Sequence, residues 1–166
     1  MAHGERPAVQ RVQPPKGPYV VVNGVMRWML SSPLSARRLG GGLLVLHLTG
    51  RKTGRVIDVP VAYVRVGEQL VVLTTSVWRV NLRGRPEVEV TLRGRLLGAR
   101  AVLVEDPDAV AQVYGARIAE LGHAKAGRRM GIRINVDRTP THEELVEAAR
   151  RDRLSVIYLT LAGDSR

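Results

Sequence analysis

The segment Gly50-Arg51-Lys52-Thr53-Gly54 holds the residues whose types and spacing most directly suggest ligand chemistry. Its two glycines would let the backbone turn amides outward, and Arg51, Lys52 and the following Arg55 would add positive charge. Backbone amides and cationic side chains in such an arrangement bind phosphate groups. The alternative is an exposed hairpin tip whose charges only protect a strand edge. The residues alone leave both interpretations open.

A second set of candidates follows in residues 76–83. Trp78, Asn81 and Leu82 are spaced by three and four positions, so they would share one face of a short helix. That face would place the indole over the end of a β-barrel. Packing against the core is the more common role for a tryptophan in such a position.

Several familiar catalytic and metal-binding patterns are absent from the sequence. His3, His47, His123 and His142 lack metal-ligand spacing, so we expect no metal, and His47 is expected to be buried and hydrogen-bonded in an apolar strand. The chain has no Gly-x-Ser-x-Gly turn, P-loop or dinucleotide-binding glycine pattern. It also has no cysteine, which excludes disulfides, iron–sulfur clusters and thiol nucleophiles. Any redox chemistry therefore needs a bound cofactor.

The net charge of +11 is concentrated in the first part of the chain. Residues 1–104 carry 16 basic and 5 acidic side chains, whereas residues 105–166 carry ten of each. A one-sided positive field attracts anions, which include nucleic acid, acidic lipid and phosphorylated small molecules. The alternative is a general preference for arginine on solvated surfaces. Aromatic residues make up only 4% of the chain, which is few for a protein that stacks single-stranded nucleic acid.

Apolar patterns place these candidates on a mainly β framework. Strands are expected over residues 43–49, 55–66, 69–75, 87–92, 95–104 and 154–161, and the loop 50–54 joins the first two as a hairpin. Helices are expected over residues 18–30, over 76–83, from Asp106-Pro107 to Gly122, and from the Thr141 and Glu144 capping box to about Arg153. The fold class predicted is α+β and mainly β, a small antiparallel barrel with flanking helices.

The length of 166 residues predicts a single domain, over residues 18–166, after a proline-containing flexible leader over 1–17. Asn23, Gly24 and Arg27 interrupt the longest apolar run near the N-terminus, so neither a membrane span nor a signal peptide is expected. A cytoplasmic location is the default. The amphipathic segment around Trp28 leaves peripheral membrane contact as an alternative.

The order of these motifs resembles the deazaflavin-dependent nitroreductase family, which comprises split β-barrels related to the FMN-binding pyridoxamine phosphate oxidases. The resemblance spans roughly residues 18–104. It is carried by the loop 50–54, Val59-Pro60-Val61, Trp78-Arg79-Val80-Asn81-Leu82 and Pro86-Glu87-Val88-Glu89-Val90. It implies a split barrel that binds coenzyme F-420, a deazaflavin with a phosphate and an oligoglutamate tail. The implied activity is hydride transfer to a nitroaromatic, a quinone or another small electron-poor acceptor.

The resemblance also implies roles for individual residues. Gly50, Arg51, Lys52, Thr53, Gly54 and Arg55 would hold the phosphate and tail, and Thr75 and Ser76 would lie near the deazaflavin edge. Pro60, Trp78 and Asn81 would complete the cofactor site, and Tyr63 and Tyr114 are candidate proton donors or substrate contacts. One departure stands out, because Thr75-Ser76-Val77 runs directly into Trp78 where the family has a longer glycine-containing loop.

Two alternatives to the F-420-dependent oxidoreductase stay open at this point. One keeps the fold but binds FMN, another flavin or a tetrapyrrole. The other is a non-catalytic basic module that binds nucleic acid or an acidic membrane, with steep salt dependence as its signature. In the leading hypothesis, the partner of the protein is a small-molecule electron acceptor and no nucleic acid is bound. The protein is expected to be a monomer or a homodimer.

Overall fold

The computed structural model describes residues 6–12 and 41–163. The helix expected over residues 18–30 and the segment around Trp28 lie outside the described residues. The chain divides into two compact units. Their described parts belong to a barrel unit (Pro14–Val72, Ser76–Leu103 and Ile157–Arg166) and a helical unit (Met1–Gln13, Leu73–Thr75 and Val104–Val156).

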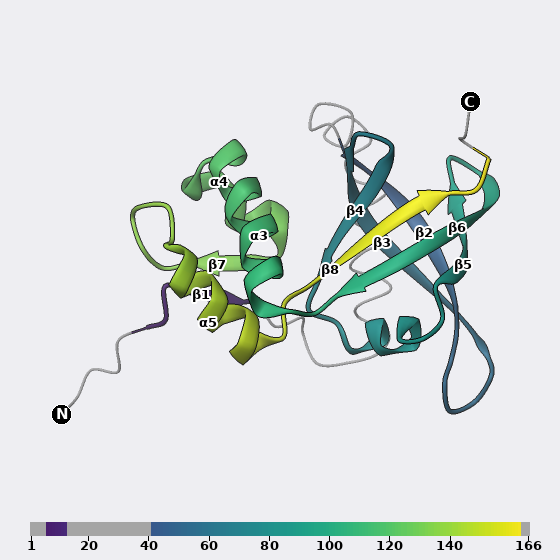
Figure 1. Cartoon of the computed structure of the whole chain (residues 1–166). Helices are drawn as coiled ribbons and strands as arrows, with labels where there is room; N and C mark the ends of the chain where they lie inside the picture. The colour runs from purple at the N-terminus through teal and green to yellow at the C-terminus, as the bar shows by residue number, and fades with distance from the viewer. Residues whose placement is uncertain (1–5, 13–40, 164–166) are drawn as a thin grey trace. The chain divides into compact units, whose positions relative to one another are not determined.

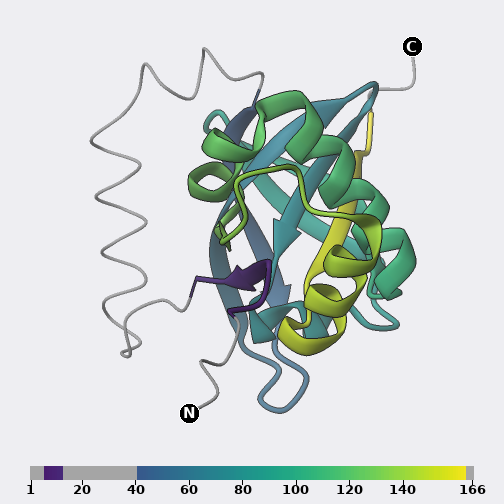
Figure 2. The ribbon, with the colours of Figure 1, turned by 90° about the vertical axis from the view of Figure 1, so that its left-hand side faces the viewer.

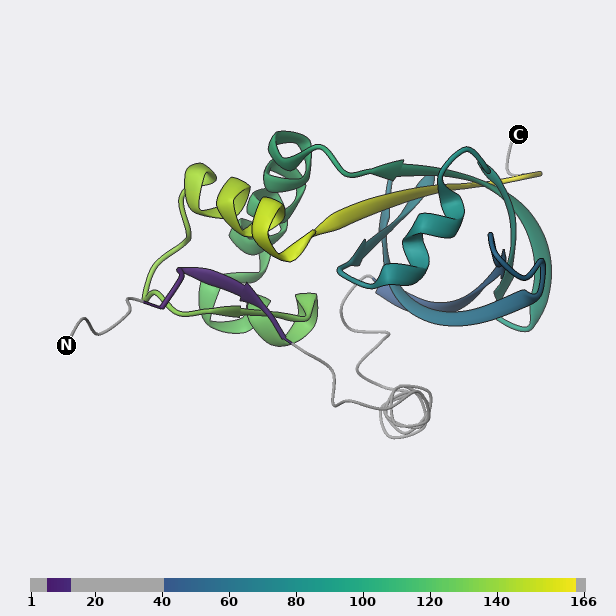
Figure 3. The same cartoon turned by 90° about the horizontal axis from the view of Figure 1, so that it is seen from below.

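Six strands close into a barrel in the order β2-β3-β4-β8-β6-β5 (Figures 1 and 3). This arrangement confirms the predicted mainly β fold, an antiparallel barrel. The last strand of the chain, β8, inserts between β4 and β6 and completes the barrel. The strands are β2 (Gly41–Thr49), β3 (Val56–Val66), β4 (Gln69–Thr74), β5 (Glu87–Leu92), β6 (Arg95–Val104) and β8 (Ser155–Leu161).

Two antiparallel hairpins set the register of the barrel wall. In the first, β2 pairs with β3 from Thr49 opposite Val56 to Gly41 opposite Val64. The second joins β5 to β6, and β5 also pairs with β2. Both hairpins were predicted from the apolar strand patterns and the glycine turns, because these patterns act within a few residues of each other.

The barrel interior is filled by the alternate side chains that point inward. On β2, Leu44, Leu46 and Leu48 are each at most 2% exposed, while the residues between them face outward. Burying a leucine side chain is worth about 2 kcal/mol. The period of two therefore fixes which face of each strand enters the core.

The helical unit combines three α-helices with a two-stranded sheet. Helices α3 and α5 pack side by side (Figure 2) and bury Tyr114, Ile118, Leu145 and Ala148. The elements of this unit are β1 (Val9–Arg11), α3 (Pro107–Leu121), α4 (His123–Met130), β7 (Ile132–Ile134) and α5 (His142–Asp152).

Both long helices begin at the residues that the sequence predicts. The Asp106 carboxylate accepts a hydrogen bond from the amide of Ala109 at 3.0 Å and caps α3. At the start of α5, the amide of Glu144 donates to the Thr141 hydroxyl at 3.2 Å, and the amide of Thr141 donates to the Glu144 carboxylate at 2.8 Å. This is the expected capping box.

Three short elements were not predicted from the sequence: β1, β7 and α4. Val9 on β1 is 1% exposed and pairs with Ile134 of β7, so this part of the expected leader forms a strand. Strands of three residues are too short to show a hydrophobic period. Helix α4 lies so close to β7 that a Cβ on Gly127 would come within 2.9 Å of the carbonyl oxygen of Ile132.

The single domain expected over residues 18–166 stays a prediction. In the part of the chain that is described, no helix combines the length and the apolar character needed to cross a lipid bilayer.

Candidate functional site

The hairpin tip between β2 and β3 is a compact loop with its own hydrogen bonds (lower right in Figure 1). The amide of Gly50 donates to the carbonyl of Arg55 at 2.8 Å, and the amide of Gly54 donates to the carbonyl of Gly50 at 2.9 Å. The Thr53 hydroxyl accepts from the amide of Arg55 at 3.3 Å. Gly54 has a φ of +67°, which favours glycine at this position.

The predicted short helix is a 3₁₀ helix, η1 (Val77–Leu82). Leu82 is buried in the barrel core, and Trp78 is partly buried and packs against that core. The role of Trp78 in binding the cofactor stays a prediction. Arg79 is also buried, and its guanidinium donates to the carbonyl of Ser76 at 2.7 Å. Asn81 donates through Nδ2 to the carbonyl of Trp78 at 2.9 Å, which fixes its side chain.

Arg51 fastens the hairpin tip to η1. Its amide donates to Oδ1 of Asn81 at 3.0 Å. Its Nη1 atom donates to the carbonyls of Val80 at 3.1 Å and Arg83 at 2.7 Å. Arg85 adds a further link from Nη1 to the carbonyl of Thr49 at 3.0 Å. The tip is therefore held in place by bonds to a segment about thirty residues further along the chain.

These bonds correct the sequence-based picture of a nest of free amides. The amides of Gly50, Arg51, Gly54 and Arg55 all donate within the protein. These four amides are therefore not available to an anion at this tip. Lys52 and Arg55 are exposed, and their side chains make no hydrogen bond or ion pair with any residue of 6–12 or 41–163.

The tip and the η1 segment together form a cationic surface, which we call the basic tip. Neither residues 50–55 nor residues 76–86 contain an acidic side chain. The guanidinium of Arg51 is used for anchoring, so the cations free to meet a ligand are those of Lys52 and Arg55. Arg83 and Arg85, which follow η1, were not singled out from the sequence, although a run of basic residues without an acid would have revealed them. The basic tip comprises Arg51, Lys52, Arg55, Arg83 and Arg85.

The structure does not bring Tyr63 to the basic tip. Tyr63 lies on β3 seven residues beyond Val56, or about 23 Å along an extended strand. Its side chain points into the barrel and is 8% exposed. Pro60 lies on β3 between the basic tip and Tyr63 and pairs with Val45 of β2. It lies outside the part of β3 that pairs with β4, which is Val64–Val66.

The other predicted site residues are placed as follows. Tyr114 lies on α3 of the helical unit and is 1% exposed, and burial raises the pKa of its hydroxyl. Thr75 and Ser76 directly follow β4 and lead into η1. The catalytic roles of Tyr63 and Tyr114 and the ring contacts of Thr75 and Ser76 stay predictions.

His47 lies on the outer side of the barrel wall with both ring nitrogens bonded. Nδ1 lies 2.7 Å from a carboxylate oxygen of Asp58, and Nε2 lies 2.7 Å from the Thr91 hydroxyl. The expected hydrogen bonds are present, but the expected full burial is wrong, since 21% of the side chain is exposed. Within residues 6–12 and 41–163, no three His, Asp or Glu side chains gather into a set that could hold a metal ion.

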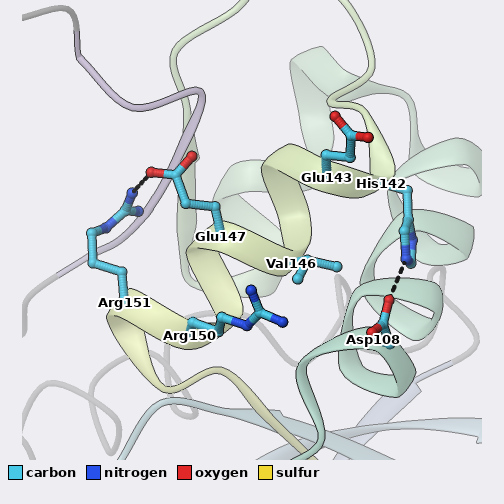
Figure 4. Close-up of a pocket in the computed structure, with 7 residues that line it drawn as sticks. All are labelled: Asp108, His142, Glu143, Val146, Glu147, Arg150 and Arg151. Atoms are coloured by element: carbon cyan, nitrogen blue, oxygen red, sulfur yellow. Dashed lines mark hydrogen bonds and ion pairs between the residues drawn. The ribbon is translucent and has the colours of Figure 1, made fainter.

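The helical unit has a surface depression of about 750 Å³ beside α5 (Figure 4). His142 lies 2.9 Å from Asp108 across it, and Arg151 pairs with Glu147 at 3.4 Å. The side chains that line it carry both signs of charge, and two acids are already paired. This surface therefore lacks the one-sided charge of the basic tip.

Several solved structures are similar to this chain. An F420 reductase shares 15% identity over 73% of this chain and 86% of that chain, with a TM-score of 0.39. A pyridoxamine 5'-phosphate oxidase-related, FMN-binding protein from Nostoc punctiforme shares 16% identity over 90% and 83%, with a TM-score of 0.44. A conserved hypothetical protein from Mycobacterium tuberculosis shares 17% identity over 93% and 85%, with a TM-score of 0.39.

No curated protein matches the chain. A family model matches residues 27–139, which is more than half of the 166 residues and includes the basic tip, η1 and five of the six barrel strands. The chain belongs to the F420H(2)-dependent quinone reductase family.

Proposed function

We propose that the protein transfers a hydride from reduced coenzyme F-420 to a quinone, with the basic tip holding the acidic part of the coenzyme. The coenzyme follows from the family to which the chain belongs. Reduced F-420 supplies the hydride, and the quinone takes up this hydride together with a proton to give a hydroquinone.

The observation that carries the proposal is the pair of exposed cations on an anchored loop. Lys52 and Arg55 have no partner among the described residues, while Arg51 ties the same loop to η1 and its C-cap residue Arg83 through three hydrogen bonds. A phosphate and a chain of glutamates would pair with these cations without first ordering the loop. Preorganisation of this kind strengthens binding because less conformational entropy is lost.

The residues present fit the anionic end of the coenzyme in chemical type. Lysine and arginine provide charge-assisted hydrogen bonds to phosphate and carboxylate oxygens. Thr75 and Ser76, which directly precede η1 in the chain, are proposed to lie near the edge of the deazaflavin. The barrel wall would orient the ring, and the short Thr75-Ser76-Val77 connection would leave the ring with fewer loop contacts than in a protein with a longer insertion.

The experiment is a titration of the purified protein with F-420, followed by quenching of tryptophan fluorescence. The variants are Lys52→Ala and Arg55→Ala, with Lys125→Ala as a control that removes one exposed lysine from α4 of the helical unit. We expect each tip variant to weaken binding about tenfold, which corresponds to about 1.4 kcal/mol. The control should bind like the wild type.

Two further measurements sharpen the test. The loss in the tip variants should shrink at high ionic strength, because salt screens exposed charges. A parallel titration with FMN distinguishes the two coenzymes, since FMN has a phosphate but no oligoglutamate tail. Equal affinity for F-420 in all variants, or tighter binding of FMN than of F-420, would overturn the proposal. Turnover of a soluble naphthoquinone, compared with a nitroaromatic of similar size, tests the acceptor.

A further inference from the structure

The mouth of the barrel at the end away from the basic tip contains a pocket of about 370 Å³. It lies within the barrel unit, where the β5–β6 turn and the C-terminal end of β8 meet the end of β3. Its polar side chains are Tyr63, Arg65, Arg93 and Arg95, and its apolar walls include Leu97 and Leu161. A pocket of this volume is of the size that accommodates small ligands.

Among the described residues that line this pocket, all of the charge is positive. Arg65 comes from β3, Arg93 and Arg95 come from the β5–β6 hairpin, and no acidic side chain of residues 6–12 or 41–163 lines the cavity. None of the three forms a hydrogen bond or ion pair through its side chain with a residue in the described ranges. Three guanidinium groups around one cavity repel each other, and an anion bound between them would relieve that repulsion.

The hydroxyl of Tyr63 supplies a neutral donor in the same pocket. The residue is 8% exposed and makes no hydrogen bond with any described residue. Among the described side chains, only the hydroxyl of Tyr114 is both fully buried and without a hydrogen-bond partner. The Tyr63 hydroxyl also has no partner, so it is not fully buried, and the open space next to Tyr63 is the pocket that it lines. Gly42 makes room for it, because a Cβ there would lie 2.7 Å from the Tyr63 oxygen.

Arg93 has a strained backbone conformation, which does not favour an arginine at this position. Arg93 and Gly94 form the two-residue turn between β5 and β6, with φ values of +50° and +77°. Such turns favour Asn, Asp or Gly at the first position, because a bulkier side chain in the left-handed region is strained by about 1 kcal/mol. The turn nevertheless presents a guanidinium to the pocket.

We propose that this pocket binds a small organic acid, with its carboxylate or phosphate held by the three arginines and Tyr63. Arginine forks and a tyrosine hydroxyl are suited to the oxygens of such groups. The leucine walls would accommodate an aromatic or aliphatic body of modest size. The site is distinct from the basic tip, since β3 separates the two along its length.

The test uses the full chain without F-420, so its outcome is independent of the proposed oxidoreductase function. Benzoate, phenyl phosphate, inorganic phosphate and benzyl alcohol are titrated while backbone amide signals are followed by NMR. Benzoate and phenyl phosphate should give saturable shifts at residues 93–98 and 161–163, and inorganic phosphate should bind more weakly. Benzyl alcohol should give no saturable shifts, because it lacks the anionic group. Comparison of benzoate with phenyl phosphate shows which anionic group the site prefers.

The key variant is Arg93→Asn, which removes a guanidinium while placing a favoured residue in the turn. Its matched control is Arg100→Asn, an exposed arginine of β6 that does not line the pocket. We expect Arg93→Asn to fold at least as stably as the wild type and to bind benzoate at least fivefold more weakly, with a smaller loss for Tyr63→Phe. The control should bind normally. Equal benzoate affinity in Arg93→Asn and Arg100→Asn, or shifts that never saturate, would refute the site.

Discussion

The amide of Arg51 donates a hydrogen bond to the side-chain oxygen of Asn81 at 3.0 Å, and this bond joins the tip of the first hairpin to η1. The same asparagine donates to the carbonyl of Trp78 at 2.9 Å. One side chain therefore sets both the position of the loop and the geometry of the helix. The order of the basic tip depends on a residue that carries no charge.

Replacing Asn81 with alanine should consequently weaken F-420 binding through loss of order. The substitution removes both hydrogen bonds, and we expect the free energy of unfolding to fall by about 1–3 kcal/mol in urea denaturation. The loss of coenzyme affinity should persist at high salt, whereas the loss in Lys52→Ala should diminish. An Asn81→Ala defect that vanishes with added salt would argue against the anchoring role.

The close approach of Gly42 to the Tyr63 ring predicts that a larger residue at position 42 destabilises the protein. In Gly42→Ala, the new methyl group would lie 2.7 Å from the Tyr63 oxygen and 2.8 Å from the ring carbon that bears it, so the buried ring must move. We expect a loss of about 1–3 kcal/mol in the free energy of unfolding. Gly98→Ala is the control, because its Cβ would meet Ala162 at an ordinary 3.5 Å. Replacing Tyr63 with leucine in the same chain should restore part of the loss.

Removing the buried hydroxyl of Tyr114 distinguishes a packing role of this residue from a catalytic role. No described residue accepts or donates a hydrogen bond at this oxygen, so Tyr114→Phe removes an unsatisfied polar group. We expect the thermal midpoint to stay equal or rise, since burying an unpaired hydroxyl is unfavourable. Quinone reduction should also be retained. A large fall in kcat with unchanged stability would instead support the proton-donor role predicted from the sequence.

The pH dependence of stability should include a contribution from Glu144. Hydrogen bonds from Arg138 and from the amide of Thr141 lower the pKa of this carboxyl to about 2. A lowered folded-state pKa means that the stabilisation is present above the ordinary pKa near 4.5 and is lost as the pH falls toward 2. Urea denaturation between pH 2 and 7 should show this loss in the wild type, and Glu144→Gln should show less of it.

Glu143→Gln is the matched control for this measurement. Glu143 occupies the same first turn of α5 but does not take part in the capping box. Its substitution should leave the acid limb of the stability curve close to that of the wild type. An identical acid limb in Glu144→Gln and the wild type would show that the Arg138 and Thr141 contacts contribute nothing measurable.

The sequence by itself determined the barrel strands and the two long helices of this protein, but not the short elements β1, β7 and α4. Apolar runs bounded by turn residues mark the six barrel strands, and in strands with clear alternation, such as β5, a period of two fixes the buried face. Asp106, Thr141 and Glu144 mark the helix starts, because their side chains bond to amides three residues away. The basic character of the Gly50–Gly54 loop was also evident, and the motif order identified the family.

Tertiary structure decided which of these residues meet. The insertion of β8 between β4 and β6, the clamp between Arg51 and η1, and the pairing of β1 with β7 all join segments far apart in the chain. Such contacts depend on register and barrel closure, and a local period of residues carries no information about either. The length of β3 separates Tyr63 from the basic tip, and the closed barrel places Tyr63 beside arginines of the β5–β6 hairpin at the far mouth.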